Sequence, residues 1–77
     1  MNFKIYTTNW CPYCTAAKRL LQEKGLDYEE IDIEKLEMSR EDLEKITGGR
    51  SVPQIVMDDK PIGGYDDLQA LAASGKI

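Results

Sequence analysis

The chain has no histidine and only two cysteines, and these scarcities narrow the chemistry open to its 77 residues. Structural zinc usually takes four cysteine or histidine ligands, so a single chain of this composition cannot complete such a site. The sequence also lacks any apolar run that approaches the length of a membrane-spanning segment. We therefore expect neither a metal site nor a membrane segment.

Positive charge is also scarce, because ten lysines and arginines stand against 14 aspartates and glutamates, for a net charge of −4. The sequence has no cluster of basic residues that could bind along a phosphate backbone, so nucleic acid is not an expected partner. The first residues are too few and too polar for a signal peptide, which predicts a cytoplasmic protein. A hydrophobic content of 42% and a charged content of 31% are typical of a globular domain. We expect one domain over residues 1–77 and a monomer.

The two cysteines, Cys11 and Cys14, are separated only by Pro12 and Tyr13. Proline favours the first position of a helix, where its fixed φ fits and its missing N–H costs nothing. Cys11 would then lie at the helix entrance, and Cys14 one turn later on the same face. Helix entrances stabilise anions, and a cysteine there has a pKa in the range of about 3.5 to 7.5 instead of roughly 8.5. We expect Cys11 to be the nucleophile and Cys14 to be the resolving thiol.

Three simpler interpretations of the pair compete with this one: a structural disulfide, half of a zinc site, and two inert buried thiols. A disulfide over so short a spacing closes almost no loop and would stabilise the fold very little. In a reducing cytosol a lone C-x-x-C is more often catalytic or metal-binding than structural. The sequence favours redox catalysis.

Alternating apolar residues predict a central strand over residues 2–7, which leads directly into the cysteine loop. A helix is expected over residues 12–24, with Lys18 facing away from its apolar side. A half-buried strand near residues 28–33 would carry a solvated acidic outer face. Ser39 and Asp42 resemble a capping box that opens a helix through about Thr47.

The second half of the chain predicts two strands and a helix. In the helix that Ser39 opens, Leu43 and Ile46 should point inward. A strand over residues 54–58 turns at Asp58-Asp59 into a short edge strand around residues 60–62. The last helix should begin at residue 65 or 66 and bury Leu68, Leu71 and Ala72.

This order of elements, β-α-β-α-β-β-α, predicts an α/β fold with a four-stranded mixed sheet. The first two strands would be parallel through a right-handed helical crossover, and the last two would form a hairpin. A C-x-x-C motif directly after the first strand of such a pattern is typical of a thioredoxin-like fold.

Three motifs give the chain a resemblance to the dithiol glutaredoxins over essentially its whole length. They are Cys11-Pro12-Tyr13-Cys14, Ser51-Val52-Pro53 and Gly63-Gly64-Tyr65-Asp66-Asp67. The first is fairly specific, the second common and the third moderately specific, but their joint order and spacing strengthen the match.

The resemblance implies glutathione as a co-substrate, with no bound cofactor. It implies catalytic roles for Cys11 and Cys14. It also implies a glutathione site made by seven other residues of the motifs, namely Tyr13, Ser51, Val52, Pro53, Gly64, Asp66 and Asp67. The backbone of Val52 would pair with the tripeptide, and the helix start at Asp66 would hold its γ-glutamyl end. Plainer explanations compete: an exposed aromatic for Tyr13, a turn proline for Pro53, and helix capping for the two aspartates.

One position departs from the family pattern. Many relatives carry a lysine three residues before the nucleophilic cysteine, where this chain has Thr8. Arg40 matches another position at which the family often has a basic or amide residue for the glycine carboxylate of glutathione. Arg50, near the proline turn, is a second candidate, and a solvated surface arginine is the alternative for both.

The resemblance thus implies a thiol-disulfide oxidoreductase acting on disulfide-containing or glutathionylated proteins. An alternative is a glutaredoxin-like redoxin reduced by thioredoxin reductase that donates electrons to ribonucleotide reductase. A third interpretation, from another class, is a glutathione-assisted iron–sulfur cluster carrier, which Pro12 disfavours by stiffening the turn.

Overall fold

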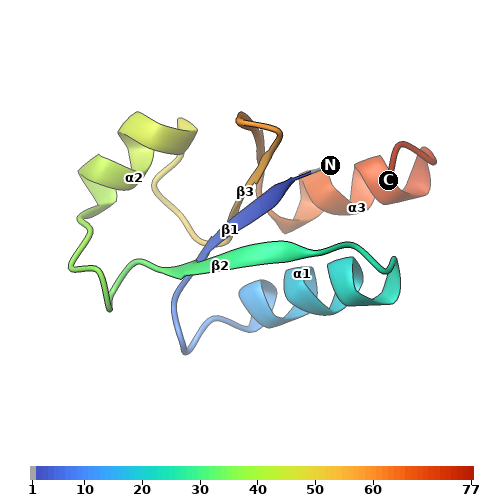
Figure 1. Cartoon of the computed structure of the whole chain (residues 1–77). Helices are drawn as coiled ribbons and strands as arrows, with labels where there is room; N and C mark the ends of the chain where they lie inside the picture. Colours follow the sequence, from blue (N-terminus) through green and yellow to red (C-terminus); the bar gives the residue numbers. More distant parts are fainter. Residues whose placement is uncertain (1) are drawn as a thin grey trace.

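The structure is a computed structural model that describes residues 2–77, and it forms one four-stranded sheet with helices on both faces (Figure 1). The elements follow the predicted order: β1 (Phe3–Thr7), α1 (Pro12–Glu23), β2 (Tyr28–Asp32), α2 (Arg40–Thr47), β3 (Gln54–Met57), β4 (Lys60–Gly63) and α3 (Tyr65–Ala73). Within residues 2–77, no helix combines the length and the apolar character needed to cross a bilayer.

The strands lie in the order β2-β1-β3-β4, so β1 is central, as predicted. β2 runs parallel to β1, while β3 is antiparallel to both β1 and β4. Pro61 lies in β4 at the edge of the sheet, where one side of the strand needs no backbone donor. The mixed sheet and the α/β fold class are confirmed.

The alternation of β1 divides its side chains between two apolar clusters. Phe3 and Ile5 point to the face covered by α1 and α3, whereas Tyr6 points to the face covered by α2. The first cluster consists of Phe3, Ile5, Ala17, Leu21, Ile55 and Leu68. The second consists of Tyr6, Ile33, Leu43 and Val56. Because β1 is fixed by both clusters, the loop that follows it starts from a rigid base.

Helix α2 confirms its predicted start but corrects its predicted buried face. Ser39 caps the helix through the Asp42 N–H to Ser39 Oγ bond of 3.0 Å, and Asp42 accepts in return from the Ser39 N–H. Leu43 is fully buried, but Ile46 is 46% exposed, so its predicted inward orientation is wrong. Thr47 is buried instead, because its hydroxyl donates to the Leu43 carbonyl at 2.9 Å and is therefore satisfied.

Helix α3 starts at Tyr65, as predicted, but its buried face is shorter than expected. Leu68 is fully buried, whereas Leu71 and Ala72 are only partly buried. α3 packs on α1 and on the edge strand β4, so its last turn has little of the sheet to cover.

Candidate active site

Cys11 is the N-cap of α1, and Pro12 occupies the first turn as predicted. The Cys14 N–H donates to the Cys11 sulfur over 3.2 Å, in the manner of a capping side chain. The Cys11 thiol in turn faces the Val52 carbonyl oxygen at 3.7 Å. Helix N–H groups and the macrodipole therefore favour negative charge on this sulfur.

Cys14 has a different environment, although it lies only one turn further along α1. It is 1% exposed, against 6% for Cys11, and both thiols are free. Burial, followed by the hydrogen bond with Cys11, raises the pKa of Cys14 to about 12. At neutral pH Cys14 is therefore a protonated thiol, and Cys11 is the more accessible of the two sulfurs.

A groove begins beside Cys11 and runs to the start of α3. It is a cavity of about 440 Å³ lined by Tyr13, Ser51, Val52, Pro53, Gly64, Tyr65, Asp66 and Asp67. The Val52–Pro53 peptide bond at its floor is cis. Three motifs distant in the sequence thus meet at one place, and the structure brings together every residue that the resemblance assigned to glutathione except Arg40.

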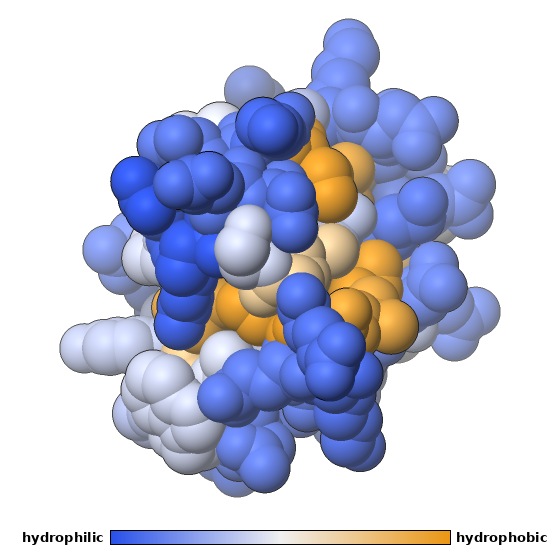
Figure 2. Space-filling view, turned by 90° about the vertical axis from the view of Figure 1, so that its left-hand side faces the viewer, coloured by the Kyte–Doolittle hydropathy of each residue, from blue (hydrophilic) through white to orange (hydrophobic). Residues whose placement is uncertain are grey.

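Arg40 lies in a second cavity, on the other side of Tyr13. This cavity is also about 440 Å³ and is lined by Trp10, Cys11, Pro12, Tyr13, Arg40, Arg50, Ser51 and Val52. Arg40 Nη1 donates to the Arg50 carbonyl at 3.1 Å, which ties α2 to the loop before β3. Figure 2 shows the end of the molecule that lies at the left of Figure 1, where apolar surface is enclosed by hydrophilic side chains.

Two aromatic residues at the site, Trp10 and Tyr65, were missed by the sequence reasoning. Trp10 is 64% exposed and lines the cavity beside Cys11. The sequence offered one signal for it, its position directly before Cys11. The rings of Tyr65 and Tyr13 lie with centroids 6.4 Å apart. Their tilted contact closes one wall of the groove.

Thr8, at the position where many relatives have lysine, is buried and 3% exposed. Its hydroxyl has no hydrogen-bond partner among residues 2–77. Two arginines, Arg40 and Arg50, line the cavity beside Cys11.

The described residues contain no group of three or more histidine, cysteine, aspartate or glutamate side chains arranged to hold a metal ion. The helix of the parallel β1-α1-β2 unit begins at a capping cysteine, and a second cysteine follows one turn later. These features define a dithiol protein of the thioredoxin-like fold.

Comparison with known proteins narrows this class. The family model described as glutaredoxin matches residues 3–62. The chain is 48% identical to "Glutaredoxin" of Pseudomonas aeruginosa, covering 95% of this chain and 87% of the relative. It is 47% identical to "Glutaredoxin 3" of Escherichia coli, covering 99% and 92%. The chain belongs to the glutaredoxin family and is a thiol-disulfide oxidoreductase.

Solved structures agree with this assignment. Reduced Escherichia coli glutaredoxin aligns with a TM-score of 0.76 and 32% identity over 99% of this chain and 98% of that chain. The buckwheat glutaredoxin-glutathione complex aligns with a TM-score of 0.85 and 28% identity over 96% and 70%. The thioredoxin-like fold is thus confirmed.

Proposed function

We propose that this protein uses glutathione to reduce protein disulfides and glutathione mixed disulfides through Cys11 and Cys14. The observation that supports this most strongly is the groove, which joins the neighbours of the Cys11 sulfur to the start of α3. Glutathione is a short extended peptide with a carboxylate at each end, and the groove offers a matching set of groups along its length.

The middle of the groove fits a peptide backbone. Val52 lies between α2 and β3, outside the sheet, so its backbone can pair with an extended ligand in the manner of an added strand. The Val52 carbonyl already lies 3.7 Å from the Cys11 sulfur, so a ligand paired there would hold its own cysteine next to Cys11.

The far end of the groove fits a carboxylate and an amine. Gly64 caps α3 and has no side chain, so the first N–H groups of the helix are open to a ligand carboxylate. Asp67 accepts from the Gly64 N–H at 3.1 Å, and both Asp66 and Asp67 are exposed. Their carboxylates would attract the γ-glutamyl amine. Arg40 would attract the glycine carboxylate at the opposite end, from the second cavity.

The reaction proceeds in two exchanges. The Cys11 thiolate attacks the glutathione sulfur of a mixed disulfide, the Cys11–glutathione disulfide forms, and the substrate protein leaves as a thiolate that takes up a proton. Free glutathione then attacks the glutathione sulfur and releases Cys11, or Cys14 attacks Cys11 and releases glutathione. With a protein disulfide, Cys11 bonds to one substrate sulfur and the other leaves as a thiolate; Cys14 then attacks Cys11 and releases the first substrate sulfur as a second thiolate. Two glutathione molecules reduce the Cys11–Cys14 disulfide that remains and leave as glutathione disulfide.

This proposal predicts different effects for the two cysteines in a coupled assay with a glutathione mixed disulfide, glutathione and glutathione reductase. Cys11→Ser should abolish turnover, because it removes the helix-capping nucleophile. Cys14→Ser should retain it, because one protein thiol and free glutathione suffice. Equal loss in both variants would contradict the assigned roles.

One observation favours a different reductant for this protein, thioredoxin reductase in place of glutathione. Thr8 is buried and uncharged where many relatives have lysine, which removes one attraction for glutathione. The alternative is therefore a redoxin reduced by thioredoxin reductase that donates electrons to ribonucleotide reductase. Replacing glutathione and its reductase with thioredoxin reductase in the same assay distinguishes the two, and the glutathione system should be the faster.

The proposed reaction needs a pool of reduced glutathione, so we assign it to the cytoplasm, where such a pool keeps thiols reduced. An iron–sulfur cluster shared between two chains would use the same Cys11 and the same bound glutathione. Visible absorbance of the purified protein would support that role, whereas a colourless, active monomer supports oxidoreductase activity.

A further inference from the structure

Lys18 lies one helical turn after Cys14, on the side of α1 that faces β2. Residues four apart on a helix are neighbours, and helical side chains lean toward the N-terminus, so the Lys18 side chain leans toward the turn that carries Cys14. Although the sequence predicted a solvated lysine, its side chain is only 27% exposed. Its ammonium group pairs with Glu30 Oε2 over 2.9 Å.

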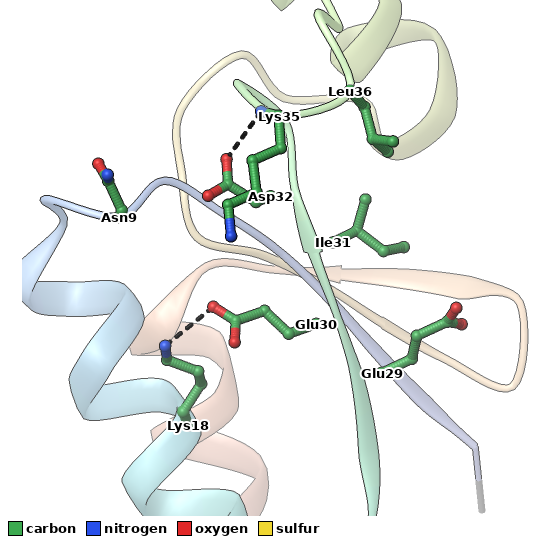
Figure 3. A pocket seen from close by; sticks show the side chains of 8 residues that line it. All are labelled: Asn9, Lys18, Glu29, Glu30, Ile31, Asp32, Lys35 and Leu36. Carbon is green, nitrogen blue, oxygen red and sulfur yellow. Dashed lines mark hydrogen bonds and ion pairs between the residues drawn. The ribbon is translucent and has the colours of Figure 1, made fainter.

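Glu30 is itself held from the other side. The Thr7 hydroxyl donates to the same Glu30 oxygen at 2.9 Å, and Thr7 is fully buried at the end of β1. The hydrogen bond from Lys18 is the main reason why the pKa of Glu30 is lowered, so the carboxylate stays charged. Figure 3 shows Lys18 reaching from α1 to Glu30 on β2, at the wall of a cavity of about 550 Å³. Residues of three elements thus hold in place the ammonium group of a lysine that follows Cys14 by one helical turn.

Cys14 needs such a cation when it resolves the mixed disulfide. In that step the Cys14 thiol gives its proton to water and attacks the Cys11 sulfur. The Cys11–Cys14 bond forms, and the bond from Cys11 to the leaving sulfur breaks. The leaving thiolate departs with the electron pair and takes up a proton from water. A thiol that is 1% exposed is poorly suited to becoming an anion, since burial disfavours its charged form.

We propose that Lys18, held in place by Glu30 and Thr7, is a positioning residue that stabilises the Cys14 thiolate during the resolving step. This rests on the proposed function only in requiring Cys14 to resolve a mixed disulfide on Cys11. Because Lys18 acts through Cys14, it should matter for the dithiol route and not for the monothiol route.

The charged groups near this pair are few. Cys11 and Lys18 act electrostatically on Cys14. Glu30, the ionisable side chain of Tyr28 and Cys14 act on Lys18, and Asp32 also acts on Glu30. A hydrogen bond with the Thr8 backbone also favours the Cys14 anion, and Lys18 is the one cation among these groups that does so. The charge of a Cys11 thiolate opposes it in the free dithiol and is absent once Cys11 is bonded in the mixed disulfide. Removing the lysine charge should therefore act on the resolving step with little compensation.

The test uses a symmetrical aromatic disulfide that releases a coloured thiolate, so that the resolving step is measured without glutathione. Attack by Cys11 releases the first coloured thiolate, in a phase that depends on reagent concentration. Attack by Cys14 releases the second, in a phase that does not. Lys18→Gln should slow the second phase by roughly threefold to thirtyfold at neutral pH and leave the first unchanged.

The pH profile separates this effect from a loss of structure. The second-phase rate should rise about tenfold per pH unit below the pKa of Cys14, and Lys18→Gln should displace this line to higher pH. Lys18→Arg should restore it, since the positive charge is kept. Lys24→Gln is the matched control, because it removes the same charge from the far end of α1, beyond a Debye length of about 8–10 Å.

Four outcomes decide the matter. A slower second phase in Lys18→Gln, rescued by arginine and absent from Lys24→Gln, supports the proposal. An unchanged second phase overturns it, as does an equal loss in both glutamine variants. A displaced first phase with an unchanged second phase would also overturn it, by assigning Lys18 to Cys11. Failure of the proposed function would appear separately, as a normal reaction with the aromatic disulfide and none with glutathione disulfide.

Discussion

The two cysteine sulfur atoms, one turn apart on α1, meet different surroundings. Cys11 caps the helix and accepts the Cys14 N–H, whereas Cys14 is enclosed by the core. The first environment favours an anion, and the second favours a neutral thiol. The order of reaction that we propose, Cys11 first and Cys14 second, therefore follows from where the helix begins.

This asymmetry predicts a pH dependence of stability for the reduced protein. Burial raises the pKa of Cys14 to about 12, above the value of the unfolded chain, so the unfolded state loses its proton first as pH rises. The contribution of the buried thiol is present below pH 9 and is lost as pH rises toward 12. We expect the free energy of unfolding to fall by up to about 1.4 kcal/mol per pH unit above pH 9.

Urea unfolding between pH 8 and pH 10.5 measures this effect, with Cys14→Ala as the control. Tyrosines and lysines titrate in both proteins and largely cancel in the difference. The free energy of unfolding of the wild-type protein relative to that of Cys14→Ala should decrease as pH rises. A difference that stays constant with pH would show that Cys14 titrates as it does in the unfolded chain.

Among the elements, the junction between β4 and α3 carries a steric requirement. Gly63 has a φ of 109°, and a Cβ there would collide with the Asp67 carboxylate, which accepts from the Gly64 N–H. Gly25, after α1, has a φ of 70° but open space around its Cα. The two glycines share the left-handed backbone, and only one also needs the missing side chain.

Gly63→Ala should therefore destabilise the fold more than Gly25→Ala. The backbone alone costs about 1–2 kcal/mol in either variant, and the collision with Asp67 raises the cost at Gly63 to about 2–4 kcal/mol. Thermal or urea unfolding of both variants measures the difference. Equal losses would show that Asp67 moves aside without cost and is not a fixed part of the groove.

The sequence predicted the elements well because their signals are local. Alternation in β1, Pro12 at the start of α1 and the capping box at Ser39 each act within a few residues. The error at Ile46 shows the limit of periodicity in a helix of eight residues, where two positions fit the apolar face almost equally. Thr47 was preferred because the Leu43 carbonyl accepts its hydroxyl, which only the packed structure reveals.

For the molecule as a whole, the resemblance found the groove residues because three motifs carry them. It could not place Lys18, since the Lys18–Glu30 pair joins α1 to β2 through a crossover and depends on tertiary packing. Trp10 was missed for another reason, because a single aromatic residue in a loop carries no periodic pattern. Local chemistry was thus readable from the chain, and contacts between elements were not.

In the function proposed for this protein, glutathione bonded to Cys11 lies in the groove between Tyr13, Pro53 and α3. The most direct measurement is backbone amide NMR of Cys14→Ser before and after reaction with glutathione disulfide, with intact mass to count the bound tripeptides. We predict one glutathione per chain and the largest amide shifts at Val52, Gly64, Asp66 and Asp67. The absence of a stable mixed disulfide, or shifts that cluster instead around Asn9 and Lys35 in the cavity of Figure 3, would contradict glutathione binding in this groove.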